Sequence, residues 1–445
     1  MQYDEAIDYL MSLADMERGR QSSRDPVMSL DSIRSLLDRL DRPQHGRGTV
    51  HITGSKGKGT TAAMIEGILR TAGESTALYT SPHLHSYTER IRFGEDPVSP
   101  GEFATGLEAI IPAIQAERES DTGEVSTFGV LTALFFWLVR AQVIPVRWQV
   151  VEVGLGGSFD ATNVFDTVDA AVITPISLST RRFSGSTVTE IARDKAGIIR
   201  PGCVCVLAPQ QDPAVRPIVE ERCREVGAEL IDVSEAYETE VVERHVFGQS
   251  FNVTGPKGTR ELRTPMLGAH QVENAATAVA VADALAGRGA SVDEDAISTG
   301  IARIRVPGRM EVMGRSPLVV ADGAHNGASA EALVNALRDY LEWQRCFVVL
   351  GATRDKDIPA IGAKLAEIAE MFICTPIDNP RSMDTADMLK HLGTLGPPAV
   401  AEPSLPAAMD TALGRATTSD LVCVTGSLYL VAEARTHVLG ESVTS

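Results

Sequence analysis

The sequence is poor in cysteine and has no long apolar run. None of its six cysteines stands at a metal-binding spacing, and Cys203 and Cys205 alternate with valines, as buried free thiols do. We therefore expect no cysteine metal site and a reducing, cytoplasmic environment. The longest apolar run, 130–139, is too short to span a bilayer. Residues 1–13 carry acids and no basic stretch, so we expect neither a signal peptide nor membrane association.

The sequence also lacks an excess of basic residues. It has 41 Lys and Arg against 59 Asp and Glu, a formal net charge of -18. This argues against a nucleic-acid-binding surface, and an anionic ligand would need a local positive site. A length of 445 residues with 44% hydrophobic residues predicts a globular protein of two or three domains.

A glycine-rich turn between a short apolar strand and a helix is the first candidate site. We call residues 54–61 the glycine–lysine loop, and its candidate ligand-binding residues are Gly54, Gly57, Lys58, Gly59, Thr60 and Thr61. The glycines let backbone N–H groups approach an anion, and the start of the helix adds further N–H donors. The lysine can meet the outer phosphates, and a threonine hydroxyl can lie near a metal. The loop therefore predicts a triphosphate site.

The loop departs from the strict P-loop pattern G-x-x-x-x-G-K-[ST]. Ile52 stands at the first glycine position, and Gly59 stands at the Ser/Thr position. A glycine-rich strand-to-helix turn without any ligand therefore remains an alternative interpretation. The residues further along the chain favour the phosphate site.

The rest of the chain alternates helices and strands, which indicates an α/β protein with a parallel, doubly wound sheet. We expect helices over 3–20, 29–41, 61–72, 100–116, 127–142, 187–199, 213–226 and 270–286. We expect strands over 76–80, 148–153, 170–176, 203–208, 318–322, 346–350, 371–375 and 421–425. Short β-rich pieces in 237–266 predict a small antiparallel addition.

A Pro-Gly turn within 303–309 predicts a domain boundary. We expect residues 1–304 to form a P-loop-type, ATP-binding domain with an N-terminal helical cap. Residues 305–445 should form a smaller, Rossmann-like α/β domain.

Several polar residues follow predicted strands, at the sheet edge where α/β proteins bind ligands. Glu152 ends an apolar strand and is a candidate Mg²⁺ ligand against the phosphates, although such an acid alone is more often a solvated loop residue. Ser81 precedes a proline and could equally be a turn former or a metal or phosphate ligand. Lys195 lies near a helix end, where a surface lysine is the simplest interpretation.

Two more groups of residues lie later in the chain. His270 and Asn274 share a helix face by their i, i+4 spacing and can meet one ligand. Asp322, His325 and Asn326 follow a strand and open a helix, where Asp322 and Asn326 also suit a helix N-cap. With Arg309, they make a second nucleotide contact a reasonable expectation.

Motifs along nearly the whole chain resemble one family. The first two read GSKGKGT and YTSPHL. The motifs lie at 54–60, 79–84, 89–92, 152–163, 195–198, 270–274, 307–309, 322–326, 355–357 and 426–429. In this order they resemble folylpolyglutamate synthase/dihydrofolate synthase, a branch of the ATP-dependent Mur ligase superfamily.

The resemblance implies an ATP- and Mg²⁺-dependent ligase of folate metabolism. ATP would phosphorylate a folate or pteroate carboxylate, and L-glutamate would attack the acyl phosphate between the two domains. Lys58 and Thr60 would hold phosphates, Ser81 and Glu152 would bind magnesium, and Lys195 would be carbamylated and help a second metal. The nucleotide or cleft contacts implied by the family are Asn274, Arg309, Asp322 and His325. We expect a monomer.

The sequence departs from the family pattern where a second metal would bind. Ser179 and Thr180 stand in place of an aspartate and a histidine, and a hydroxyl is a poorer metal ligand than imidazole. Our hypothesis is that Arg181 or Arg182 replaces part of the lost positive charge. Two further departures are Gly129 and Ser158.

These departures leave two alternatives open. One is a weakened nucleotide-binding homologue with a regulatory role, and the other is a ligase for a non-folate acceptor. Lys58, Glu152 and Lys195 are retained, which favours an active ligase.

Overall fold

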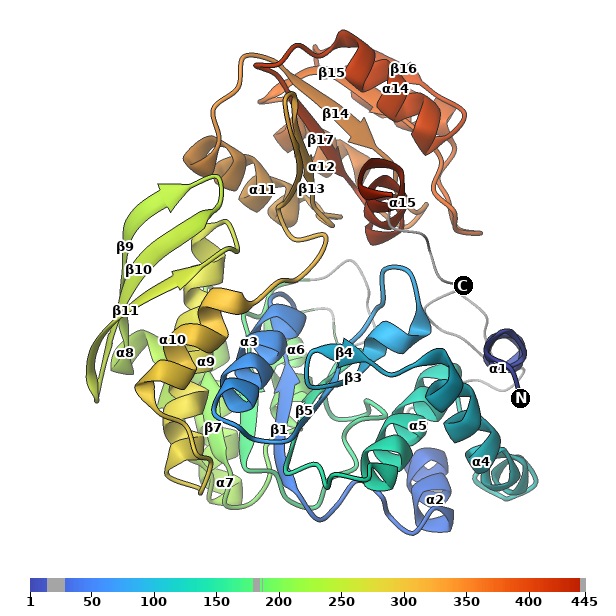
Figure 1. Ribbon diagram of the computed structural model, residues 1–445, viewed down its shortest axis with the longest axis vertical. Coiled ribbons are helices and arrows are strands. Elements are labelled where there is room, and N and C mark those ends of the chain that lie inside the picture. The colour runs from blue at the N-terminus through green and yellow to red at the C-terminus, as the bar shows by residue number, and fades with distance from the viewer. Residues whose placement is uncertain (14–28, 179–184, 186, 441–445) are drawn as a thin grey trace.

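The computed structural model describes residues 1–13, 29–178, 185 and 187–440. Its strands form an eight-stranded sheet, a three-stranded sheet and a six-stranded sheet, which we call the large, small and second sheets (Figure 1). The predicted α/β class is confirmed. Ser179, Thr180, Arg181 and Arg182, and the part of the predicted first helix from residue 14 on, lie outside the described residues.

The large sheet has the strand order β4-β3-β2-β5-β1-β6-β7-β8. Its strands are β1 (Gly48–Thr53), β2 (Thr76–Tyr79), β3 (Ile91–Phe93), β4 (Asp96–Pro97), β5 (Trp148–Glu152), β6 (Ala170–Ile173), β7 (Val204–Leu207) and β8 (Glu229–Asp232). From β2 to β8 neighbouring strands pair in parallel, and only β3 and β4 add antiparallel pairs at one edge. Because β2, β5 and β1 are neighbours, the loops that follow them meet at one edge of the sheet.

Both faces of the large sheet are covered, since successive side chains of a strand point to opposite sides. Val151 packs into one hydrophobic core and Val150 into the other. The first core is closed by α1 (Tyr3–Ser12), α2 (Asp31–Arg39), α4 (Pro100–Arg118), α5 (Thr127–Ala141), α6 (Val188–Ala196) and α7 (Val215–Val226). The second is closed by α3 (Lys58–Thr71), α8 (Val233–Ala236), α9 (Ala269–Ala286) and α10 (Glu294–Arg303).

The small sheet is antiparallel, as the β-rich pieces predicted. It consists of β9 (Glu238–His245), β10 (Gly248–Gly255) and β11 (Gly258–Thr264). Phe251, Val253 and Leu262 bury one of its faces in the core shared with α9 and α10. The β9–β10 turn reaches toward α11 (Gly327–Tyr340), a helix that covers the second sheet (Figure 1).

The second sheet has the strand order β12-β13-β17-β14-β15-β16, in which only β12 pairs antiparallel. Its strands are β12 (Glu311–Arg315), β13 (Leu318–Ala321), β14 (Cys346–Leu350), β15 (Ala369–Cys374), β16 (Ala399–Ala401) and β17 (Leu421–Thr425). One face packs against α11 (Gly327–Tyr340), α12 (Ile358–Leu365) and α13 (Thr385–Leu392). The other packs against α14 (Leu405–Arg415) and α15 (Leu428–Leu439).

The predicted elements agree with the structure except at their ends and edges. Strands 346–350 and 421–425 have the predicted bounds, whereas the helix expected from residue 61 begins at Lys58. The helices α8 and α10 and the strands β3, β4, β8, β12 and β16 were not predicted. None of the described helices is both long and apolar enough to cross a bilayer.

Candidate nucleotide and metal site

The glycine–lysine loop joins β1 to α3 and includes the first turn of α3, and its shape depends on glycine. Gly57 caps the N-terminus of α3 with a φ of 81°, in the left-handed region. A Cβ there would lie only 2.6 Å from Oδ1 of Asn274, so a side chain would collide as well as strain the backbone. The free N–H groups of the first turn of α3 therefore stay open to an anion.

Lys58 and Glu152 meet at the carboxyl edge of the large sheet. Lys58 Nζ lies 3.9 Å from Oε1 of Glu152, and the backbone N–H of Ser81 donates to its Oε2 at 3.0 Å. Burial raises the pKa of Glu152, while the charges of Lys58 and Arg309 oppose the rise. A lysine and a carboxylate this close can serve one bound triphosphate and its metal.

The donors at this edge suit magnesium, which prefers oxygen ligands and keeps several waters. Glu152 is almost fully buried and supplies one carboxylate, and Ser81 belongs to the turn that contacts it. In the described part of the chain, no group of three or more His, Cys, Asp or Glu side chains could hold a metal. The remaining ligands would therefore come from phosphate oxygens and water, as is usual for Mg²⁺.

Lys195 is not a surface residue, so the simplest interpretation of its sequence position is wrong. Its side chain is buried, and Nζ donates to the carbonyl of Gly54 at 2.9 Å and to that of Gly156 at 3.3 Å. Burial, and next the charge of Lys58, lower the pKa of Lys195 to about 7. Near neutral pH a large fraction of this amine is therefore uncharged, which is the form that can react with CO₂.

The N-terminal half of α9 contacts the glycine–lysine loop through Asn274. Thr61 Oγ1 lies 3.4 Å from Asn274 Oδ1, and the amide of Asn274 donates to Gln271 Oε1 at 2.9 Å. Gln271 in turn lies 3.1 Å from Nε2 of His270. Thr61 thus faces Asn274, and Asn274 is held in place by its own helix.

Asp322, the first of the residues predicted after β13, lies near Arg309. Asp322 accepts the N–H groups of Met310 and Ala324, each at 2.8 Å. Burial raises the pKa of Asp322, and the charge of Arg309 opposes the rise. Because Arg309 also acts on Glu152, it links the second sheet electrostatically with the first site.

Of the two residues predicted to suit a helix N-cap, Asp322 and Asn326, only Asn326 is one. Asn326 is the N-cap of α11 and accepts the N–H of Ser329 at 2.9 Å, which confirms that interpretation. Asp322 instead holds the segment before β12, so it is not an N-cap. His325 Nδ1 lies 2.9 Å from the carbonyl of Gly323, within its own turn.

Sequence reasoning did not single out two buried charged residues near the site. Asp160 accepts the N–H of Leu155 at 2.8 Å, and its charge opposes the lowering of the pKa of Lys195. Arg90 is almost fully buried, donates to Nδ1 of His83 at 2.8 Å, and favours the ionised form of Glu152. A lone acid after a glycine-rich turn was the available signal for Asp160.

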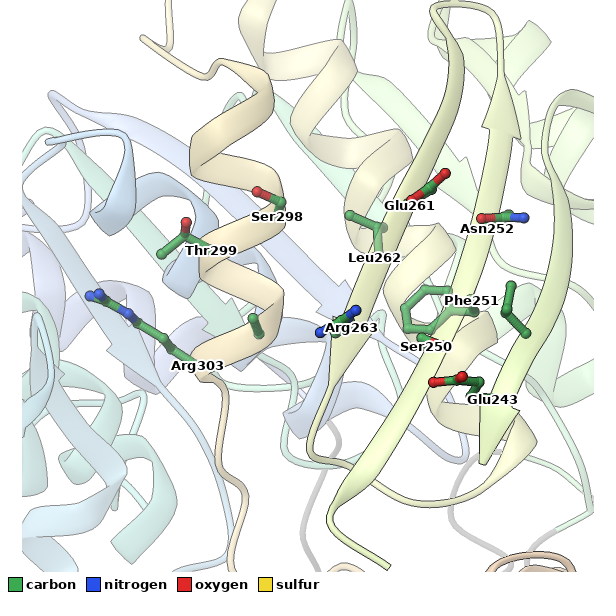
Figure 2. A pocket seen from close by; sticks show the side chains of 12 residues that line it. Glu243, Ser250, Phe251, Asn252, Glu261, Leu262, Arg263, Ser298, Thr299 and Arg303 are labelled. Atoms are coloured by element: carbon green, nitrogen blue, oxygen red, sulfur yellow. The ribbon is translucent and has the colours of Figure 1, made fainter. Parts of the chain in front are cut away.

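A hollow lies away from this site. It measures about 550 Å³ and lies between the small sheet and α10 (Figure 2). Its lining carries Glu243 and Glu261 as well as Arg263 and Arg303, so it has no excess of positive charge for a phosphate. Residues of the glycine–lysine loop do not line it.

Comparison with known proteins agrees with this geometry. Residues 308–428 match the family model "Mur ligase, glutamate ligase domain". The fold and this match define a protein of the Mur ligase class, with the glycine–lysine loop on the large sheet and the glutamate ligase domain match around the second sheet. The dihydrofolate synthase/folylpolyglutamate synthases of Mycobacterium tuberculosis and Escherichia coli are each 34% identical. The matches cover 83% and 86% of this chain and 78% and 84% of theirs. The chain belongs to the folylpolyglutamate synthase/dihydrofolate synthase family.

Solved structures extend the similarity to the whole fold. Mycobacterium tuberculosis folylpolyglutamate synthase, complexed with ADP and AMPPCP, superposes with a TM-score of 0.87 at 30% identity over 98% of both chains. Escherichia coli FolC in complex with DHPP and ADP gives 0.85 at 29% identity, over 99% of this chain and 98% of that one. A probable bifunctional folylpolyglutamate synthase/dihydropteroate synthase of Halobacterium salinarum is 35% identical over 98% of this chain. The chain spans only 52% of that relative.

Proposed function

We propose that the protein is an ATP- and Mg²⁺-dependent ligase that joins L-glutamate to the carboxylate of a folate or pteroate-like acceptor. The observation that carries this proposal is the 3.9 Å approach of Lys58 to Glu152, at the N-terminus of α3. Two anions, the triphosphate and the acceptor carboxylate, must come together, and positive charge at this edge lowers their repulsion.

The reaction has two steps. A carboxylate oxygen of the acceptor attacks the γ-phosphorus of ATP, which gives an acyl phosphate and ADP. The amino group of glutamate then attacks the acyl carbon, phosphate leaves, and the amine loses a proton. Lys58 and the N–H groups of the glycine–lysine loop hold the phosphates during transfer. When bound, Mg²⁺ neutralises charge on the phosphate oxygens.

Each remaining predicted residue has a proposed role. Ser81 and Glu152 would hold the metal, Lys195 would act as a carbamate at a second metal, and Asn274 would contact the nucleotide. Lys195 now donates to two carbonyls, and its carbamate would retain one N–H, so one of these bonds would be lost on carbamylation. The contacts proposed for the second part of the site are Arg309, Asp322 and His325.

We further propose that residues 1–304 and 305–445 are the two domains, with glutamate bound between them, and that the protein is a monomer. Closing such a cleft would protect the acyl phosphate from water. Size-exclusion chromatography with light scattering tests the monomer.

Phosphate release tests the reaction. The assay contains ATP, Mg²⁺, L-glutamate and one acceptor, either pteroate, tetrahydrofolate or an unrelated carboxylate. We expect release that requires both glutamate and a folate or pteroate acceptor, and that is lost in Lys58→Met. Phosphate release with the unrelated carboxylate, but with neither pteroate nor tetrahydrofolate, would show that the protein is a ligase for a non-folate acceptor.

A regulatory nucleotide-binding homologue is the second candidate, and the replacements at Ser179 and Thr180 favour it. It predicts ADP binding, measured by calorimetry, without release of phosphate for any acceptor.

Repeating the release assay with and without bicarbonate tests the carbamate, because only a carbamylated Lys195 needs CO₂.

A further inference from the structure

A buried hydrogen bond joins the small sheet to α11, a helix that covers the second sheet. Tyr340, the last residue of α11, donates its hydroxyl to Oε1 of Gln249 on β10 at 2.5 Å. The exposed fractions of Gln249 and Tyr340 are 4% and 6%, so water does not compete freely for this bond. Arg244 also lies over the Tyr340 ring, 5.8 Å from its centroid.

The other end of the Gln249 amide holds the segment in front of α9. Its Nε2 donates to the carbonyl of Met266 at 2.8 Å and to that of Gly268 at 2.9 Å. These two bonds fix which end of the amide faces Tyr340. Met266 packs in the core of the large and small sheets, whereas Leu267 packs in the core beside α11. The segment 266–268 is therefore the seam between the two cores.

The contact is local. A hollow of about 300 Å³ opens beside it, lined by Phe247 and Met266 on one side and by Arg309 and Met310 on the other. Around this hollow, Val246 also packs against the core beside α11, and Arg315 lies over the Phe247 ring, 4.4 Å from its centroid. A bond in this position can fix the placement of α11 relative to the small sheet.

The seam leads directly to the glycine–lysine loop. Gly268 is the N-cap of α9, and its carbonyl accepts the N–H of Gln271 at 3.0 Å. Gln271 holds the amide of Asn274, and Asn274 Oδ1 fills the space beside Gly57. Any shift of the start of α9 therefore moves the side chain that closes the loop.

We propose that Gln249 and Tyr340 are positioning residues, which set the start of α9 and thereby hold Asn274 against the glycine–lysine loop. This inference rests on the proposed function of the loop as the nucleotide site. It makes nucleotide affinity depend on how α11 is placed. By linkage, nucleotide binding then stabilises the Tyr340–Gln249 contact by the same free energy.

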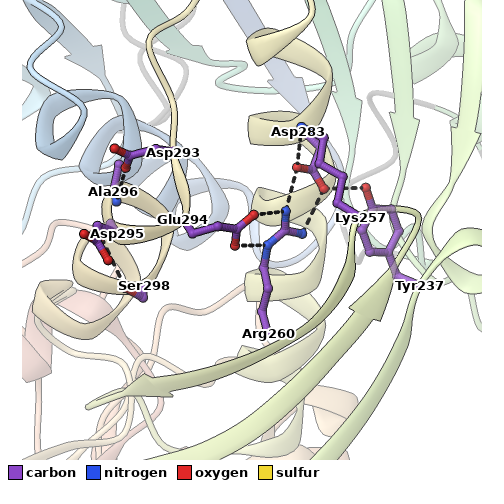
Figure 3. A network of polar contacts seen from close by, with 9 residues as sticks. All are labelled: Tyr237, Lys257, Arg260, Asp283, Asp293, Glu294, Asp295, Ala296 and Ser298. Atoms are coloured by element: carbon purple, nitrogen blue, oxygen red, sulfur yellow. Dashed lines mark hydrogen bonds and ion pairs between the residues drawn. The ribbon is translucent and has the colours of Figure 1, made fainter.

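The test is the affinity of the full chain for ADP, measured by titration calorimetry in Tyr340→Phe. The change removes one hydroxyl and keeps the ring. Tyr237→Phe is the matched control, because Tyr237 is equally buried and its hydroxyl donates to Asp283 at 3.0 Å (Figure 3). We expect ADP to bind at least about fivefold more weakly in Tyr340→Phe and unchanged in Tyr237→Phe.

Combining changes separates positioning from a general loss of stability. In an Asn274→Ala background, Tyr340→Phe should have no further effect on ADP affinity, because the residue that it positions is gone. If Tyr340→Phe does not fold, Gln249→Met takes its place with the same expectations. Equal weakening in Tyr340→Phe and Tyr237→Phe, or weakening in neither, would overturn the proposal. Absence of ADP binding to the unchanged protein would instead reject the proposed function.

Discussion

Replacing Lys195 with methionine should change how the stability of the protein depends on pH. The lysine is buried, and its amine donates to the carbonyls of Gly54 and Gly156. Methionine keeps the length of the side chain and removes the titrating group. The lost hydrogen bonds add a cost that does not depend on pH, so the pH dependence isolates the effect of the charge.

The magnitude follows from the pKa. Burial and the charge of Lys58 lower the pKa of Lys195 from 10.5 to about 7. A tenfold change in acidity corresponds to about 1.4 kcal/mol, so protonating this amine costs the folded state about 5 kcal/mol. Because the folded pKa lies below the unfolded one, this cost is absent above pH 10.5, grows as the pH falls, and levels off below about pH 7. Between pH 9 and pH 7 the free energy of unfolding should fall by roughly 2 kcal/mol through this group.

The assay is urea unfolding at several pH values in CO₂-depleted buffer, with the exposed Lys390→Met as control. The difference between wild type and Lys195→Met should change by roughly 2 kcal/mol from pH 9 to pH 7. Lys390→Met should follow the wild type. Added bicarbonate should stabilise the wild type at pH 8 and leave Lys195→Met unchanged, because a carbamate forms only on the folded protein's neutral amine.

A constant difference between wild type and Lys195→Met across this pH range would refute the reasoning. It would mean that Lys195 keeps an ordinary pKa in the folded state, so that its burial does not favour the neutral amine. Bicarbonate stabilisation of Lys195→Met would separately exclude this lysine as the site of carbamylation.

Three other changes probe the rest of the molecule. Glu152→Gln should raise the magnesium concentration needed for phosphate release at least about tenfold, and an unchanged magnesium titration would exclude Glu152 as a ligand. Gly57→Ala should raise KM for ATP about tenfold, because the new Cβ meets Asn274 at φ 81°, whereas Gly46→Ala, at φ 90° in open space, tests strain alone. Equal effects of these two alanines on KM would contradict the steric argument. Arg260→Met removes the cation shared by Asp283 and Glu294 (Figure 3), but Asp283 keeps Lys257 at 3.0 Å and Glu294 is largely exposed, so unfolding should need about 1 kcal/mol less while ADP affinity stays unchanged. A loss of ADP affinity would show that this network reaches the nucleotide site.

The pattern of apolar and polar residues predicted most of the fold, because hydrophobic periodicity depends on residues that are close in sequence. Strands such as 346–350 and 421–425 are continuous apolar runs, as expected of strands buried on both faces, and the structure gives them the same bounds. The edge strands β12 and β16 are short and half-exposed, so they carry no such pattern. The start of α3 was missed because Lys58 and Gly59 are read as loop residues until Gly57 is seen to cap the helix.

For the site, the sequence alone determined which chemical groups exist and roughly where each follows a strand. The glycine–lysine loop and Glu152 could be predicted in this way, because glycines and polar residues at strand ends have a local meaning, and Asn274 was predicted from its helical spacing with His270. The tertiary structure decided which groups meet. The burial of Lys195, the part played by Asp160 and the bond from Tyr340 to Gln249 all depend on contacts between distant segments. Burial and pairing set the charge state of a side chain, and both are properties of the packed molecule rather than of any stretch of its sequence.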